Sequence, residues 1–143
     1  MRRSRTVAEV SAQMRSIRKT NTKPELAVRR LAHAMGYRFR IHCRHLPGTP
    51  DLVFSSRKKI IFVHGCFWHR HEGCLLAKLP SARPEYWVPK FARNKRRDAV
   101  ALTALEDLGW EVLVVWECEL RDEDSLRTSL QQFLGSQTGI RVA

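Results

Sequence analysis

The pattern of apolar and polar residues predicts a chain that combines helices with short strands. Apolar residues recur at helical spacing in three segments, residues 26–35, 91–108 and 124–133. Runs typical of strands occupy four segments, residues 37–41, 51–54, 59–63 and 111–116. The resulting order, α-β-β-β-α-β-α, favours an α/β fold in which a mixed sheet is flanked by helices.

Turn and capping residues indicate how these elements begin and connect. Thr22 followed by Glu25 is typical of a helix start, because the hydroxyl caps the helix and the carboxylate lies three residues later. The runs at 51–54 and 59–63 are separated by a polar turn, which predicts a hairpin. The β-branched, apolar run at 111–116 predicts a central strand covered on both faces.

Length and composition indicate one folded domain. The chain has 143 residues, of which 43% are hydrophobic and 28% charged, and it can bury a core of its own. We expect a basic N-terminal segment at 1–20, the domain at 21–134 and a frayed tail at 135–143. No apolar run is long enough to cross a bilayer, and no apolar stretch follows the basic start. We therefore expect a cytoplasmic protein without a membrane partner.

The charge points to a polyanionic partner. Lys and Arg number 26 against 14 Asp and Glu, which gives a net charge of +12. A small domain this basic usually binds nucleic acid, although a merely solvated surface remains the alternative. Two basic clusters are candidates for gripping phosphates, Arg15, Arg18, Lys19 and Lys23, and Arg93, Lys95, Arg96 and Arg97. Asn94 and Asp98 interrupt the second cluster and are candidates for contacts to DNA or to a metal-bound water.

Residues 65–89 hold two of the four cysteines, two of the six histidines and two of the four tryptophans, and we expect them to form a loop. Four residues in and beyond it form a candidate metal site, Cys66, His71, Cys74 and Cys118. Thiolate and imidazole ligands in a closed set of four favour a structural Zn²⁺, which would pin the loop to the end of a core strand. Four free cysteines, partly buried, are the alternative. Cys43 is expected to be a small core residue.

A second cluster has the residues of a phosphodiesterase. Asp51 opens a strand beside a loop, which is a common position for a ligand of Mg²⁺. His64 and His69 lie on either side of a turn at the end of the partner strand, and Glu25 can approach from the first helix. Imidazoles can take a proton from water while the cation polarises the phosphate. A capping role for Asp51, and zinc ligation by the histidines, remain open alternatives.

Aromatic residues accompany the candidate metal loop. Phe67 and Trp68 lie inside it, and a rigid loop would present their rings for stacking or insertion between bases. Trp87 lies in a second segment that is flanked by basic residues such as Lys90. Packing of these rings over the metal loop as a small second core is equally open.

Several of these motifs together resemble one family. The resemblance is carried by Gly48–Asp51, by Phe62–Cys74 with its Gly-Cys-Phe-Trp-His block, and by Tyr86-Trp87, Arg97-Asp98 and Gly109–Cys118. The early Met14–Ile17 and Thr22–Glu25 also match. Over residues 11–121 the chain resembles the very short patch repair (Vsr) DNA mismatch endonucleases.

The resemblance implies a restriction-endonuclease-like fold with a structural Zn²⁺ and a catalytic Mg²⁺. It implies an enzyme that nicks one strand on the 5′ side of the thymine in a T·G mismatch, the product of 5-methylcytosine deamination. The expected partner is double-stranded DNA with a mismatch, with a cytosine-5 methyltransferase as a functional companion. One active site suffices for one nick, so a monomer is expected, associated with the nucleoid when bound to DNA.

The resemblance also implies individual roles. Asp51 and the backbone carbonyl of Val63 would bind Mg²⁺, and Glu25 would hold metal-bound water. His69 would activate the attacking water, with His64 as its partner near the phosphate. The zinc set would be Cys66, His71, Cys74 and Cys118. The wedge would be Phe67, Trp68 and Trp87, and further DNA contacts would come from Lys90, Asn94, Arg97, Arg15 and Lys23.

Two departures and two alternatives accompany this interpretation. The usual second carboxylate and lysine of such nucleases are absent from the strand that ends at His64, and Val63 has no hydroxyl to offer a ligand. The spacing from His71 to Cys74 is one residue longer than in some members. The alternatives are an endonuclease of the same fold that acts on other modified or unmodified DNA, and a zinc-stabilised DNA-binding module without catalysis.

Overall fold

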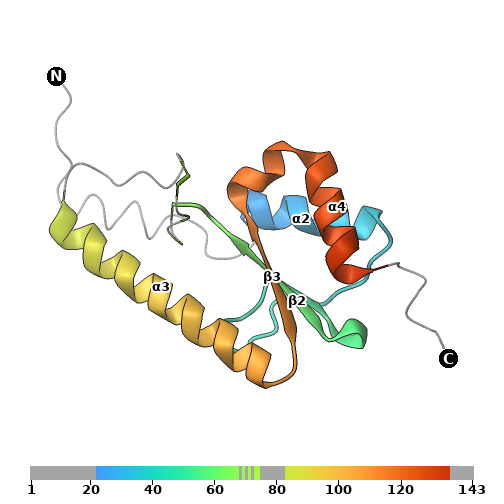
Figure 1. The fold of residues 1–143 in the computed structure, drawn as a ribbon, viewed down its shortest axis with the longest axis horizontal. Coiled ribbons are helices and arrows are strands. Elements are labelled where there is room, and N and C mark those ends of the chain that lie inside the picture. Colours follow the sequence, from blue (N-terminus) through green and yellow to red (C-terminus); the bar gives the residue numbers. More distant parts are fainter. Residues whose placement is uncertain (1–21, 68, 70, 72, 75–82, 136–143) are drawn as a thin grey trace.

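The computed structural model describes residues 22–67, 69, 71, 73–74 and 83–135 and confirms the mixed α/β architecture (Figure 1). The helices are α2 (Lys23–Ala34), α3 (Pro84–Asp107) and α4 (Glu123–Leu134), and the strands are β1 (Leu52–Phe54), β2 (Lys59–His64) and β3 (Glu111–Trp116). Two 3₁₀ turns, η1 (Ser55–Arg57) and η3 (Glu117–Arg121), complete the order. The segment expected at 1–20 and the tail after residue 135 lie outside the described residues.

The sheet of the described chain has the strand order β1-β2-β3. β1 pairs antiparallel with β2, with Leu52 opposite Ile61, so the predicted hairpin is confirmed. β2 pairs parallel with β3 along its whole length, and His64 lies opposite Trp116 at the end of the ladder. The carboxyl ends of β2 and β3 therefore meet at one edge, beside the segment that carries the Cys and His residues.

Both faces of β2 are covered by helices, which explains its unbroken apolar sequence. Ile61 and Val63 belong to a buried cluster with residues of α2 and α4. Ile60 and Phe62 face the other way and pack with Leu105 of α3. In Figure 1 the sheet correspondingly lies between α3 and the α2–α4 pair. The expected core role of Cys43 is also confirmed, since it is buried in the α3-side cluster.

Three expectations about single elements are wrong. Residues 37–41 do not form a strand within the sheet; Arg40 makes one isolated bridge to Val53. β3 is covered on both faces as expected, but in the described sheet it lies at the edge and β2 is central. The loop expected at 65–89 ends earlier, because α3 begins at Pro84. Proline suits the first helical position, which Pro84 occupies, whereas Pro89 lies inside α3 and removes one helical hydrogen bond.

The helices are fixed by caps and by contacts to the hairpin. The Thr22 hydroxyl accepts a hydrogen bond of 3.4 Å from the backbone N–H of Glu25, as expected. At the C-terminal end of α4, the last carbonyls accept hydrogen bonds from Tyr37, Arg57 and Lys59. Among the described residues no helix is long and apolar enough to cross a membrane.

Candidate active site and metal centre

A cleft of about 510 Å³ opens between α2, the end of β2 and α3. All four residues predicted to be catalytic line it, Glu25, Asp51, His64 and His69. They come from α2, from the start of β1, from the end of β2 and from the segment after β2. The fold therefore brings together residues that are up to 44 positions apart in the sequence.

Asp51 lies where β1 begins, beside the last residues of β2. Its Oδ2 atom accepts a hydrogen bond of 2.6 Å from the backbone N–H of Val63. Since the N–H and C=O of one residue in a strand point to the same side, the Val63 carbonyl also faces Asp51. The carboxylate and the carbonyl thus offer two hard oxygen donors at one point, which is the ligand chemistry of Mg²⁺.

The environment of Asp51 disfavours its charge. The pKa of its carboxyl is raised from 3.8 to about 7, chiefly by burial and to a smaller extent by the charge of the nearby Glu25. The hydrogen bond from Val63 and the charges of Arg29 and His69 act in the opposite direction. Such a desolvated carboxyl is poised to release its proton when a cation binds beside it.

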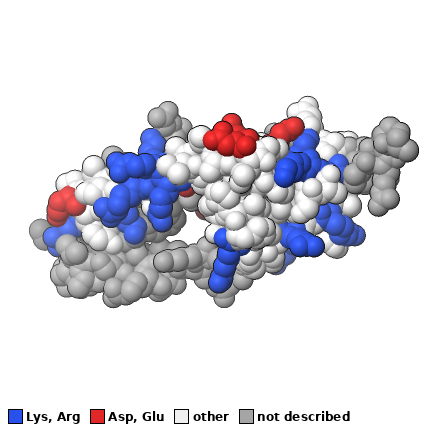
Figure 2. Space-filling view, turned by 90° about the horizontal axis from the view of Figure 1, so that it is seen from below, with Lys and Arg blue, Asp and Glu red and all other residues white. Residues whose placement is uncertain are grey.

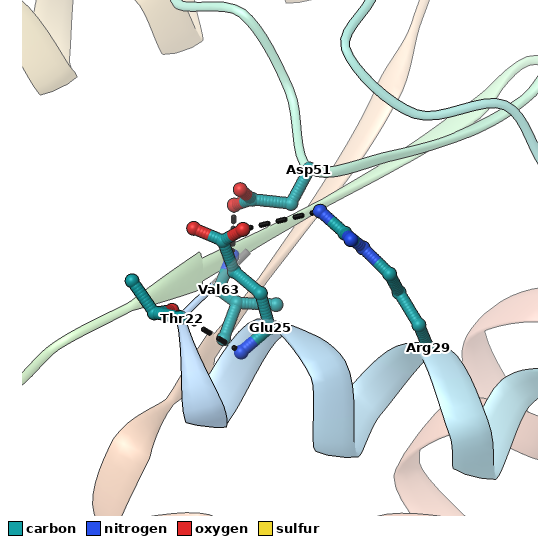
Figure 3. A network of polar contacts seen from close by, with 5 residues as sticks. All are labelled: Thr22, Glu25, Arg29, Asp51 and Val63. Carbon is teal, nitrogen blue, oxygen red and sulfur yellow. Dashed lines mark hydrogen bonds and ion pairs between the residues drawn. The ribbon is translucent and has the colours of Figure 1, made fainter. Parts of the chain in front are cut away.

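Glu25 is a second carboxylate of this site, and it is buried, with only 6% of its surface exposed. Figure 3 shows its side chain turned from the first turn of α2 toward the carboxylate of Asp51. One helical turn later, Arg29 donates a hydrogen bond of 3.1 Å from Nη2 to Glu25 Oε2. The guanidinium offsets part of the repulsion between two buried carboxylates and holds Glu25 at the cleft.

The two histidines stack on one another. The rings of His64 and His69 lie 3.8 Å apart, centroid to centroid, at an interplanar angle of 5°. Burial, followed by the adjacent charge of His69, lowers the pKa of His64 to about 4. His64 is therefore neutral where it lies against His69, an arrangement that separates the roles of the two rings.

Asp98 completes this group, and the sequence had not paired it with a histidine. Its Oδ2 atom lies 2.6 Å from His69 Nδ1. An ionised carboxylate only accepts hydrogen bonds, so Nδ1 carries the proton and Nε2 of His69 is left to accept another. The sequence pointed to Asp98 as an interruption of a basic run and as a candidate contact to DNA or to a metal-bound water, whereas its partner His69 lies 29 residues earlier.

The predicted metal cluster is also assembled. One donor atom from each of Cys66, His71, Cys74 and Cys118 lies within 4.8 Å of all the others. His71 Nδ1 is 3.6 Å from the Cys66 sulfur and 3.5 Å from that of Cys118. Bonds of about 2.1 and 2.3 Å at a tetrahedral zinc imply an N···S distance of about 3.6 Å, so the donor set fits this ion.

The environment of Cys66 supports the same interpretation. Burial raises the pKa of its thiol to about 12, so without a cation this fully buried sulfur keeps its proton. The backbone N–H of Cys118 points at the Cys66 sulfur over 3.4 Å, and such a contact stabilises a thiolate. Binding of a divalent cation would supply the charge that the thiolate needs.

Trp116 connects the metal cluster with the cleft. Its ring stacks on His71 at 4.2 Å and 9°, and it meets the ring of His64 edge-on at 5.2 Å. One ring therefore packs against a candidate metal ligand and a candidate catalytic residue. The order of the metal cluster is thereby coupled to the position of His64.

The aromatic residues of the expected wedge are found in a small cluster. The ring of Phe67 meets Trp87 and the buried Phe91 edge-on at 5.4 and 5.2 Å. Both Phe67 and Trp87 keep part of their surface exposed. Trp68 and Arg15 lie outside the described residues. These rings pack on one another as a small second core, which is what the alternative expects. Parts of Phe67 and Trp87 nevertheless stay exposed, as a platform for bases requires.

The remaining DNA-contact candidates lie on α3 and at the start of α2. Lys90, Asn94 and Arg97 line a second hollow beside α3, and Arg97 donates a hydrogen bond to Asn94 Oδ1. Figure 2 shows Lys and Arg side chains gathered on the part of the surface that α3 covers. Lys23 is exposed at the start of α2, next to the cleft residue Glu25.

The chain is similar to known DNA endonucleases and nicking enzymes. The family model described as "DNA mismatch endonuclease Vsr" matches residues 4–75. The chain is 52% identical over 121 residues to the type II nicking enzyme V.XorIIP of Xanthomonas oryzae, covering 85% of this chain and 88% of the relative. It is 42% identical over 116 residues to the DNA mismatch endonuclease Vsr of Escherichia coli, covering 81% and 74% of the two chains. A third relative, the type II nicking enzyme V.NmeAIP of Neisseria meningitidis, is 36% identical over 129 residues, or 90% and 91% of the two chains.

Proposed function

Since the chain belongs to the family of Vsr DNA mismatch endonucleases and is thereby a DNA endonuclease, we propose that it nicks one strand of a duplex on the 5′ side of the thymine in a T·G mismatch. The observation that carries the proposal is the single cleft in which two carboxylates and a His–Asp pair face one another. This set provides a cation site and a base for hydrolysis of one phosphodiester bond. The alternative of a DNA-binding module without catalysis is disfavoured, because the family to which the chain belongs consists of endonucleases.

The carboxylates are proposed to hold Mg²⁺. Asp51 and the Val63 carbonyl would be direct ligands, and Glu25 would hold a metal-bound water; Arg29 keeps Glu25 in place by its hydrogen bond. When bound, the cation supplies charge stabilisation for the phosphate and the leaving oxygen. Family membership itself implies a nuclease metal, while Mg²⁺ is favoured by the all-oxygen donors.

The proton of the attacking water is proposed to pass to His69. Asp98 fixes the ring with Nδ1 protonated, so Nε2 is the base, and the carboxylate stabilises the imidazolium that forms. His64 stacks on this ring and stays neutral at physiological pH because of its lowered pKa. It can therefore donate one hydrogen bond to a phosphate oxygen without competing for the proton.

Structural Zn²⁺ is proposed for the Cys/His cluster. The four donors belong to the segment after β2 and to η3, so the ion would join this segment to the end of β3. Four protein ligands would leave such an ion no open position, so it would serve to hold the segment that carries Phe67 and His69. A rigid segment of this kind keeps the base in place and presents the aromatic cluster to DNA.

DNA is proposed to lie across the cleft, α3 and the aromatic cluster. Phe67, Trp68 and Trp87 would enter the base stack next to the mismatch, and a T·G pair is easier to unstack than a matched pair. Lys90, Asn94, Arg97, Lys23 and Arg15 would contact the backbone or base edges. We further propose that residues 1–20 act as a DNA-contacting segment of a domain at 21–134 and that 135–143 form a tail. The enzyme would act as a monomer, alongside a cytosine-5 methyltransferase whose product gives rise to the mismatch.

A second candidate is nicking of other modified or unmodified DNA. The observation that favours it is that relatives with 52% and 36% identity are called type II nicking enzymes. Labelled duplexes that differ at one position, T·G, T·I, uracil-containing or fully matched, separate the two when the nick position is mapped with Mg²⁺ present. Our proposal predicts one nick, 5′ of the mismatched thymine, and cleavage of the matched duplex at an equal rate would refute it.

A further inference from the structure

A second hollow lies beside α3, next to the catalytic cleft. It is a groove of about 710 Å³ between α3 and the segment Pro47–Gly48. Four cationic side chains line it, Lys90, Arg93, Arg96 and Arg97. None of the described residues that line it is acidic. A groove with this charge favours an anionic chain over a neutral or a cationic ligand.

The basic run at 93–97 serves two different surfaces. Lys95 and Asp98 line the catalytic cleft, whereas Arg93 and Arg96 line only the groove. An α-helix turns by about 100° per residue, so Arg93 and Asp98 point about 140° apart around α3. What looked in the sequence like one rim is therefore divided between the cleft and the groove.

The groove continues directly from the cleft. Gly48, Arg97 and Ala101 line both hollows, so no wall of other residues separates them. Along α3, Arg93 lies five residues before Asp98, a distance of about 7.5 Å at 1.5 Å per residue. Phosphates of one strand follow each other every 3.4 Å or so along the duplex axis, so a strand that leaves the cleft can reach Arg93 within about three nucleotides.

The floor of the groove is fixed by a close contact between loop and helix. Gly48 adopts a φ of +74°, and a Cβ atom placed on it would lie 2.7 Å from the Cβ of Ala101 and 3.1 Å from the ring of Phe62. Only glycine permits this approach. The exposed guanidinium groups of Arg93 and Arg96 thus stand over a packed surface, not over a loop that can move away.

We propose that Arg93 and Arg96 bind backbone phosphates of the nicked strand, within about three nucleotides of the scissile phosphate, in the groove that continues from the catalytic cleft. The inference rests on the proposed function, because it takes the strand in the cleft to be DNA. The two arginines carry no base recognition in this arrangement. They hold the strand in register so that one defined phosphate reaches Asp51 and His69.

The first test measures how binding depends on salt. Binding of a T·G duplex is followed without Mg²⁺ for the parent, Arg93→Ala, Arg96→Ala and Arg127→Ala. Each groove variant should lower the slope of log K against log salt by about 0.9 and weaken T·G and matched duplexes by the same factor. Arg127, on α4 across the sheet and 47% exposed, is the matched control and should keep the parent slope. Parent slopes for both groove variants, or an equal loss in the control, would overturn the proposal.

The second test uses the parent protein as well, so it does not depend on how a variant folds. Single neutral methylphosphonates replace successive phosphates on each strand near the nick. The parent should lose affinity when a phosphate within three nucleotides of the nick is made neutral. The double variant Arg93→Ala/Arg96→Ala should lose no further affinity when the same phosphate is made neutral. If the losses of affinity caused by the methylphosphonate and by the double variant add up fully at every position, the inference is contradicted. Failure of the parent to nick a T·G duplex with Mg²⁺ would instead refute the proposed function, and that is measured separately.

Discussion

Replacing Asp51 by asparagine should stabilise the fold while it removes the cation site. The introduced amide is isosteric with the carboxyl group and can still accept the hydrogen bond from the Val63 N–H, but it carries no charge into the cleft. In the parent, burial and Glu25 raise the pKa of Asp51 from 3.8 to about 7. At about 1.4 kcal/mol per tenfold change in proton affinity, the ionised form costs the parent at most about 4 kcal/mol of stability.

The sign of the pH dependence follows from the same shift. The unfolded chain releases the Asp51 proton near pH 3.8, whereas the folded protein retains it up to about pH 7. The free energy of unfolding of the parent therefore falls as the pH rises through this window, and the asparagine variant lacks this loss. The gap between variant and parent should widen by about 1.4 kcal/mol from pH 6 to pH 8.

Urea unfolding in zinc-containing buffer without Mg²⁺ or chelator measures this gap, since both proteins keep the same Cys/His cluster. Asp107→Asn, an exposed carboxylate near the end of α3, is the matched control and should change stability by less than about 0.5 kcal/mol. Added Mg²⁺ should stabilise the parent alone and narrow the gap. A variant less stable than the parent at pH 8, or a gap that shrinks as the pH rises, would refute the reasoning.

Three further predictions concern the other parts of the site. Asp98→Asn should lower the Mg²⁺-dependent nicking rate at saturating DNA by at least about 10²-fold, since the amide cannot stabilise a protonated His69, and single-turnover kinetics would detect it. Cys118→Ser should lower zinc content and thermal stability together; unchanged zinc by elemental analysis would exclude this ligand. Gly48→Ala should cost about 1–3 kcal/mol more than Gly109→Ala, because both have positive φ but only the first meets a helix, and equal unfolding midpoints would contradict this.

The sequence predicted much of the fold because local patterns matched the tertiary environment. β2 has apolar residues on two faces, and both are covered by helices. The strand expected at 37–41 failed because its alternating residues find only one bridge, between Arg40 and Val53, and not a full ladder. β3 was assigned to the centre because a run buried on both faces looks the same at an edge that helices cover.

The candidate site could be predicted where its chemistry is concentrated in the sequence. Cys66, His71 and Cys74 are near neighbours, and Asp51 begins a recognisable strand. The role of Asp98 could not be recognised, because it arises only when α3 packs against the segment that holds His69. The division of the basic run between two surfaces also needed the helix phase of α3, which starts seven residues before the predicted helix.

The central claim is that Asp51 holds the cation that makes one cleft a nicking site. The most direct measurement is strand-resolved cleavage of a labelled T·G duplex with Mg²⁺ by the parent and by Asp51→Ala, with duplex binding measured in parallel. The account predicts a nick in the thymine strand for the parent, none for the variant, and comparable binding by both. Nicking by Asp51→Ala at the parent rate would contradict it.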